Sequence, residues 1–207
     1  MYVPAHFAPH EDAVGELLTA HGAADLVTST ARGMLATLLP FVYDPEAGER
    51  GSLLGHVARN NEQWSEPALG DALVIVRGPD FYVSPTWYAS KREHGRAVPT
   101  WNYLTAHVYG RLVVHDDTAW LEALVRRLTE KHERGRAEPW TVDDAPARFV
   151  AGQLRAIVGV EVVIDRVEAK FKMNQNRSAA DVDGVIAGVA GDGDEAGAAA
   201  MRAANGR

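Results

Sequence analysis

The sequence predicts an α+β fold that is mainly β, an antiparallel barrel with helices on its outside. Six or seven segments have the composition of strands, and short turns join most of them. Helical patterns interrupt these segments without a regular β-α-β-α order, and no G-x-G-x-x-G or Walker A motif is present. These observations favour a barrel over a Rossmann sheet.

Each expected strand is a short run rich in apolar, β-branched or aromatic residues. The strands are 24–30, 34–42, 52–57, 71–77, 81–83, 101–115 and 158–173. Ala31-Arg32-Gly33 is a tight connection between the first two strands. Gly78-Pro79 is a turn signal, so we expect 71–77 and 81–83 to form a hairpin, followed by a polar loop at 85–99.

The expected helices follow from apolar residues at a spacing of 3.6. They cover 10–21, 117–128, 146–157 and 178–189, and a polar helical turn lies at 58–64. Glu11 and Asp12 favour the start of the first helix through the helix dipole, and Asp117 caps the second. The Gly/Ala-rich tail, 191–207, is either a marginal helix or a disordered extension, and we assign it no function.

Length and composition are typical of a globular protein. The 207 residues suit one large domain with at most a small appendage, and 46% of them are hydrophobic. No apolar run is long enough for a membrane span, and the N-terminus lacks the basic start of a signal peptide. We therefore expect a cytoplasmic protein without a membrane partner.

Charge and motif content exclude several classes of function. The net charge of −7 opposes nonspecific DNA affinity, although a local basic patch would still bind phosphates. The absence of Cys excludes disulfides, thiolate nucleophiles and Cys-ligated metals. The eight His residues show no metal-site spacing, and no G-x-S-x-G motif is present, so we expect neither a metal site nor a hydrolase triad.

The first candidate site is the segment 56–64, where a strand leads into a helical turn. Free backbone N–H groups at a helix start favour an anion. The side chains that add polar groups there are His56, Arg59, Asn60 and Gln63. The segment fits a phosphate or a polar ring; alternatively, it is a solvated helix with His56 as a hydrogen-bonded core residue.

The second candidate is a pair of similar phrases, 85–88 and 99–103, on either side of the polar loop. Trp87 and Trp101 are rigid, flat side chains with a polar tip. They would line a flat heteroaromatic ligand, or they pack in the core or between subunits.

The third candidate is the segment 170–178, which holds three cations and three amides without an acid. Lys170 and Lys172 alternate in a strand and so share one face. Such a basic edge in an acidic protein indicates a bound anion. A phosphate-bearing cofactor, a nucleic-acid contact and a solvated strand end all remain open.

In their order along the chain, these phrases resemble the PaiB-like family, described as FMN-binding negative transcriptional regulators. The blocks that carry the resemblance are 1–7, 39–41, 56–61, 78–79, 84–88, 98–103 and, with gaps, 170–186. The resemblance covers residues 1–190, which we expect to form one FMN-binding domain with helical additions; residues 191–207 form the tail.

The resemblance implies a six-stranded antiparallel split barrel, similar to pyridoxamine-phosphate oxidases and flavin reductases, that binds FMN between the subunits of a homodimer. The expected FMN-binding residues are Thr28, Ser29, Thr37, His56, Arg59, Asn60, Gln63, Trp87, Trp101, Asn102, Lys170, Lys172, Gln175 and Arg177. Arg59-Asn60-Asn61 stands where an Arg-Lys pair is usual in those oxidases, and the cations of 170–177 would compensate.

Three functions are compatible with this resemblance. The first is an FMN-dependent oxidoreductase or flavin reductase with NADH or NADPH as electron donor. No general acid or base is obvious, and His56 and His107 are the candidates for proton delivery. The second is a PaiB-like regulator without catalytic activity, for which we expect no direct DNA binding because no helix-turn-helix pattern occurs. The third is a haem-binding or haem-degrading split barrel.

Overall fold

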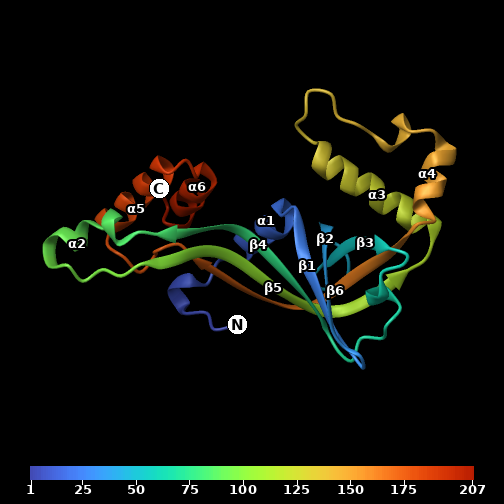
Figure 1. The fold of residues 1–207 in the computed structure, drawn as a ribbon, viewed down its shortest axis with the longest axis horizontal. Helices are drawn as coiled ribbons and strands as arrows, with labels where there is room; N and C mark the ends of the chain where they lie inside the picture. The colour runs from blue at the N-terminus through green and yellow to red at the C-terminus, as the bar shows by residue number, and fades with distance from the viewer. The chain divides into compact units, whose positions relative to one another are not determined.

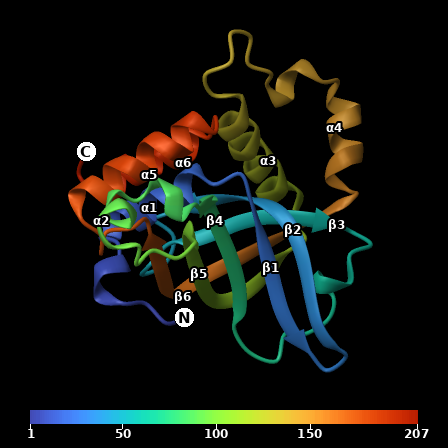
Figure 2. The same ribbon diagram turned by 60° about the vertical axis from the view of Figure 1, so that its left-hand side comes forward.

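A computed structural model describes all residues, 1–207. Six strands follow one another in the order β1-β2-β3-β6-β5-β4 and close into a ring (Figures 1 and 2). They are β1 (Ala23–Thr30), β2 (Gly33–Asp44), β3 (Ser52–Ala58), β4 (Ala72–Val83), β5 (Thr100–His115) and β6 (Ile157–Lys172). The ring closes because Leu26 of β1 lies opposite Thr37 of β2 on one side and opposite Val74 of β4 on the other. The predicted six-stranded antiparallel barrel with helices is confirmed.

Ten helical segments accompany the strands. The α-helices are α1 (Glu11–Ala20), α2 (Ala89–His94), α3 (Thr118–Glu133), α4 (Ala147–Leu154), α5 (Ala179–Gly191) and α6 (Glu195–Ala204). The 3₁₀ turns are η1 (Ala5–Phe7), η2 (Glu62–Trp64), η3 (Pro85–Trp87) and η4 (Val142–Asp144). None of the helices combines the length and hydropathy that a bilayer crossing requires.

The chain forms two compact units, which we describe separately. The barrel unit comprises 18–76 and 107–167, and the helical unit comprises 1–17, 77–106 and 168–207. Strands β4, β5 and β6 contribute residues to both units. The expected domain boundary at residue 190 stays a prediction.

In the barrel unit, alternate residues of β1 are buried, as the pleat of a strand requires. At Gly110, β5 and β6 approach so closely that a Cβ would overlap the Val163 carbonyl. Asp117 caps α3 by accepting a hydrogen bond from the Trp120 amide at 2.8 Å, as predicted. The apolar face of α3 then packs Leu124 against the strands β2 and β3.

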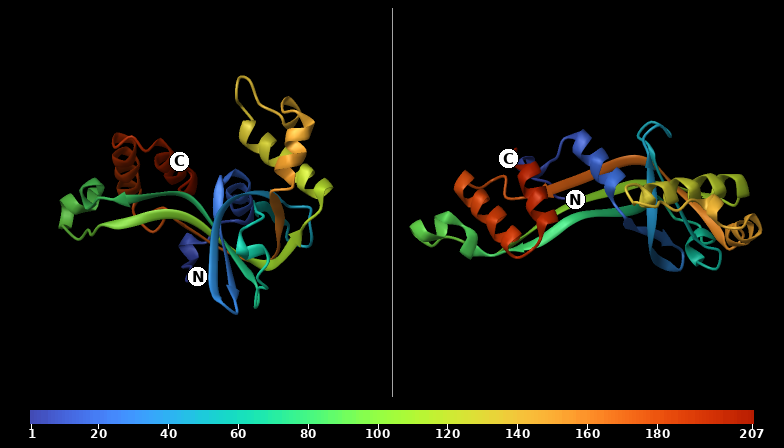
Figure 3. Two further views of the ribbon diagram at one scale, coloured as in Figure 1. Left: turned by 45° about the vertical axis from the view of Figure 1, so that its right-hand side comes forward. Right: turned by 90° about the horizontal axis from the view of Figure 1, so that it is seen from above.

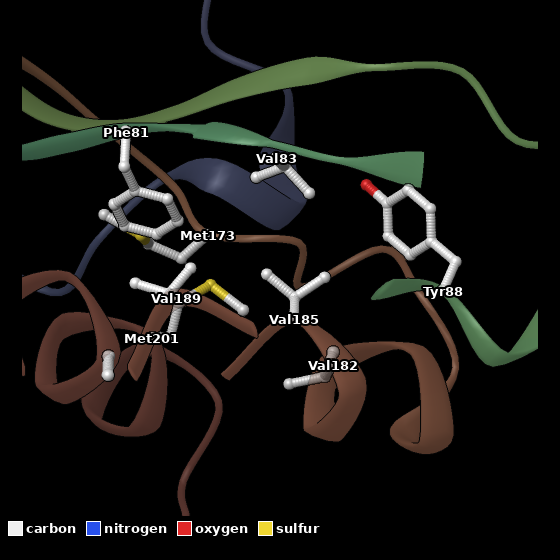
Figure 4. Packing of buried hydrophobic residues seen from close by; sticks show 9 residues of the cluster. Phe81, Val83, Tyr88, Met173, Val182, Val185, Val189 and Met201 are labelled. Atoms are coloured by element: carbon white, nitrogen blue, oxygen red, sulfur yellow. The ribbon is translucent and has the colours of Figure 1, made fainter. Parts of the chain in front are cut away.

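In the helical unit, α5 and α6 lie side by side (Figure 3). Figure 4 shows their core, in which Val185 of α5 and Met201 of α6 are close to Phe81 of β4 and to Met173. Met201 is fully buried. Of the two alternatives for the tail, the helix is therefore confirmed, and the disordered extension is wrong.

Two expectations about the middle of the chain were wrong. Gly78-Pro79 does not end a strand, because 72–83 is one continuous strand, so 81–83 is not a hairpin partner. The pairing of β4 with β1 involves only 73–75, so Pro79 lies beyond it and its missing N–H breaks no bond of that ladder. The expected loop at 85–99 contains η3 and α2.

Candidate functional site

The expected FMN-binding residues divide between the two units. Seven lie in the barrel unit, namely Thr28, Ser29, Thr37, His56, Arg59, Asn60 and Gln63. Seven lie in the helical unit, namely Trp87, Trp101, Asn102, Lys170, Lys172, Gln175 and Arg177.

In the barrel unit, Gln63 joins η2 to the hairpin of β1 and β2. Its amide nitrogen donates to the Leu26 carbonyl at 3.0 Å and to the Thr28 hydroxyl at 3.1 Å. Asn61 caps η2 and donates to the Thr37 hydroxyl at 3.0 Å. The structure thus brings Thr28, Thr37 and Gln63 together, but it uses their polar groups to attach the turn to the sheet.

Arg59 is occupied by protein groups. Its guanidinium donates to both carboxylate oxygens of Asp116, at 2.9 and 2.5 Å, and to the Ile157 carbonyl at 3.0 Å. The hydrogen bond from Arg59 lowers the pKa of Asp116 below its ordinary value. Because this bidentate pair neutralises the cation, Arg59 has little charge left for a phosphate.

His56, Ser29 and Asn60 complete this group. Burial lowers the pKa of His56, so its imidazole is neutral near pH 7, and its Nδ1 atom is buried without a hydrogen-bond partner. Ser29 and Asn60 are exposed. Sequence reasoning missed the pair formed by His115 of β5 and Glu161 of β6, in which Nε2 and a carboxylate oxygen lie 2.7 Å apart.

In the helical unit, three cations lie close to one another at the end of β6. The Lys172 ammonium donates to the Thr100 hydroxyl at 2.5 Å and to the Trp101 carbonyl. Burial, and then the charges of Lys170 and Arg177, lower the pKa of Lys172. No carboxylate forms an ion pair with Lys172, so this cluster keeps an attraction for anions.

Aromatic rings surround the same cluster. The Lys170 ammonium lies 5.6 Å from the ring centre of Tyr103 and 5.8 Å from that of Tyr2. The Arg177 guanidinium lies 4.9 Å from the ring centre of Tyr88. These cation–π contacts leave the positive charges in place, although Arg177 also interacts with the carboxylate of Asp181 and contributes to its lowered pKa.

Trp101 and Trp87 have different roles. The Trp101 side chain is 51% exposed, its indole N–H donates to Asp80 at 2.7 Å, and its ring meets Tyr82 edge to face. Trp87 instead packs against α5, where a Cβ at Gly188 would overlap its indole. Only Trp101 of this pair presents an open aromatic surface, and Asp80 and Tyr82 are partners that sequence reasoning missed.

The two amides of this group are structural. Asn102 is buried and donates to the Met201 sulfur at 3.2 Å, while its Oδ1 atom has no partner. Gln175 accepts from the Met173 amide at 2.7 Å and donates to the Phe171 carbonyl at 2.5 Å. Gln175 therefore closes the turn after β6, and its amide nitrogen keeps one N–H that these two bonds do not use.

FMN needs cations for its phosphate and flat surfaces for its ring. The residues of the helical unit fit both needs, because Lys172 has two neighbouring cations and its ammonium touches the backbone of the exposed Trp101. The barrel unit offers less for the phosphate, since Arg59 is already paired.

Comparisons with known proteins connect this chain with FMN binding. The family described as "Putative FMN-binding domain" matches residues 1–166. The protease synthase and sporulation protein PAI 2 of Bacillus subtilis is 31% identical over 188 residues, which cover 90% of this chain and 87% of that protein.

Solved structures share the fold at low sequence identity. A conserved hypothetical protein from Mycobacterium tuberculosis has a TM-score of 0.59 and 12% identity, covering 85% of this chain and 92% of its own. The FAD and heme binding protein from Mycobacterium smegmatis has a TM-score of 0.54 and 18% identity, covering 86% and 78%. The sequence match and the shared architecture lead to one assignment. This chain belongs to the PaiB-like family of FMN-binding split-barrel proteins.

Proposed function

We propose that this protein is an FMN-dependent oxidoreductase of the flavin-reductase type, with NADH or NADPH as electron donor. The observation that carries the proposal is the group of three cations around Lys172, next to the exposed ring of Trp101. When bound, FMN supplies the hydride and electron transfer, and the protein supplies binding, orientation and charge.

In this proposal, cations bind the phosphate of FMN, and an aromatic side chain contacts its ring. Lys172 and Arg177 hold the phosphate, because their charges already repel each other and an anion offsets that repulsion. Trp101 offers a flat surface to the ring and is held in place by Asp80. Lys170, fixed by aromatic contacts, adds positive potential.

The first experiment is the absorption spectrum of the purified protein, followed by titration of FMN into the apoprotein. We expect flavin bands, saturable FMN binding and FMN-dependent oxidation of NADH or NADPH. A haem absorption band in place of flavin bands would support the third function instead. Tight FMN binding without any oxidation of either nucleotide would leave a regulatory protein as the better description.

A double variant tests the placement of FMN. Trp101→Ala with Lys172→Met removes the flat surface and one charge-assisted hydrogen bond, and we expect FMN affinity to fall about tenfold or more. The control is Trp140→Ala with Lys91→Met, which changes an exposed Trp and an exposed Lys elsewhere. If both double variants keep their circular dichroism and bind FMN equally well, the placement is wrong.

We also propose that the protein works as a homodimer in the cytoplasm. The outer face of β2 supports a dimer, because Met34 is 75% exposed and Leu38 is 66% exposed, with Leu69 exposed nearby. Exposed apolar residues that lie together are typical of protein interfaces.

A further inference from the structure

The barrel unit contains a cavity whose walls carry several cations. It has a volume of about 470 Å³ and lies between the end of α1, the end of β2 and the last turns of α3. Its walls include Ala20, Val42, Tyr43, Arg127, Lys131 and Arg134. None of the fourteen residues expected to bind FMN lines this cavity.

Positive charge dominates the walls. Arg127, Lys131 and Arg134 face a single carboxylate of the lining, Glu130. Arg127 pairs with Asp44 at 2.8 Å, and Arg134 pairs with Glu130 at 3.2 Å. Of these three cations, Lys131 is therefore the one that has no carboxylate partner.

Lys131 is half-buried in spite of its charge. Its ammonium donates to the Phe41 carbonyl at 2.8 Å, and burial lowers its pKa. A helix C-terminus favours cations, which accounts for the presence of Lys131 and His132 in the last turn of α3. The helix dipole does not require the ammonium to be partly buried, and a half-buried cation without a counter-ion is costly unless an anion joins it.

The same positive potential acts on the buried side chain of His21. Its Nδ1 donates to the Leu18 carbonyl at 2.5 Å, so the neutral ring carries its proton there. Burial, and then the charges of Lys131 and His132, lower the pKa of His21 to about 4. The positive potential of the cavity residue Lys131 therefore extends to the buried His21.

We propose that this cavity binds a phosphorylated small organic molecule, with its phosphate on Lys131 and Arg134 and its flat apolar part against Val42 and Tyr43. Unlike the bidentate pair of Arg59, the contact of Arg134 with Glu130 is a single one between exposed side chains, so a phosphate can replace it. The volume is that of a pocket for a molecule of nucleotide size. The site is distinct from the residues that we assign to FMN, and it gives the protein a second ligand.

The experiment uses the full chain saturated with FMN, with AMP as the probe and adenosine as the uncharged comparison. Isothermal titration should show saturable binding of AMP that weakens with added salt, and no binding of adenosine. Lys131→Met should weaken AMP binding about tenfold or more, because it removes one charge-assisted hydrogen bond. Lys91→Met, at an exposed lysine of α2, should leave it unchanged.

Two further variants address a folding failure of Lys131→Met and binding of AMP at the FMN cluster. Arg134→Gln changes an exposed residue at the end of α3, so the fold should survive if Lys131→Met fails to fold, and AMP binding should still weaken several-fold. Lys172→Met removes a cation of the FMN cluster and should leave AMP binding intact.

Four results would overturn the proposal. The first is equal binding of adenosine and AMP. The second is wild-type AMP affinity in both folded cavity variants. The third is loss of AMP binding in Lys172→Met alone, which would place the anion in the FMN cluster. Absence of AMP binding to the FMN-saturated protein counts against the cavity as well, and it leaves the FMN titrations described above unaffected.

Discussion

At the scale of single residues, Lys131 and Lys172 resemble each other although they lie in different units. Each ammonium is half-buried, donates to a backbone carbonyl and has a pKa lowered by burial. Neither has a carboxylate partner. Because water no longer solvates such a charge fully, a bound anion gains more from it than from an exposed lysine. These two lysines are therefore the residues on which our two binding proposals depend.

A buried histidine predicts how stability depends on pH. Burial keeps His21 neutral when folded down to a pKa of about 4, whereas the unfolded chain takes up the proton near the ordinary value of 6.5. The unfolded state binds more protons between these values, so stability falls as the pH drops through this window. At pH 5 the cost is about 2 kcal/mol relative to pH 7.

Urea denaturation at pH 7 and pH 5 measures this cost. His21→Gln should lose about 2 kcal/mol less on acidification than the wild type. His10→Gln, which changes an exposed histidine, should behave like the wild type. Identical acid sensitivity of His21→Gln and the wild type would show that His21 is not the group responsible.

At the scale of elements, α5 lies close to η3 because it has glycines where the two meet. A Cβ at Gly184 would overlap the Trp87 carbonyl, and a Cβ at Gly188 would overlap the Trp87 indole. Residues four apart share one face of a helix, so the two glycines form one contact surface. This surface explains why Trp87 is a packing residue and why Trp101 alone remains for a ligand.

Alanine substitutions at two glycines of α5, Gly188 and Gly191, separate the effect of close packing from the effect of helix propensity. Gly188→Ala should lower stability by about 1–3 kcal/mol, because overpacking outweighs the gain in helix propensity. Gly191→Ala lies in the same helix with nothing near its Cβ position, and it should be neutral or raise stability by up to about 1 kcal/mol. Urea denaturation distinguishes them, and an equal effect at both positions would contradict the close packing.

The incorrect predictions for the turn at Gly78-Pro79 and for a disordered tail have the same cause. Gly78 and Pro79 are read from the sequence as a turn, because both residues favour turns locally. In the structure, β4 passes through them, and the missing side chain of Gly78 leaves room for Leu104 at 3.0 Å from its Cβ position. Similarly, the tail becomes a helix because Ala198 and Met201 find a core against α5. Tertiary contacts outweighed local signals in both cases.

At the scale of the whole molecule, the predicted dimer rests on the outer face of β2. Met34, Ala36 and Leu38 alternate along the strand and are exposed together. Covering such a face in a dimer removes apolar surface from water, which is favourable. The expected state is a dimer of 22.4 kDa subunits.

Light scattering on a dilution series checks the oligomeric state. Leu38→Glu places a carboxylate in the outer face and should shift the protein toward the monomer. Phe149→Glu introduces the same charge at an exposed apolar residue of α4 and should leave the mass unchanged. A wild-type protein that is monomeric at all concentrations would contradict the dimer.

The sequence alone determined the architecture, the family and the charged segment at the end of β6. Periodicity, helix caps and ordered phrases are local properties, so strands such as β1 and helices such as α3 follow from them. Only the tertiary structure decided which candidates retain free binding groups. Asp116 neutralises Arg59 from 57 residues away, and Asn102 meets Met201 across 99 residues. Such pairings depend on how distant segments pack, and no local pattern encodes them.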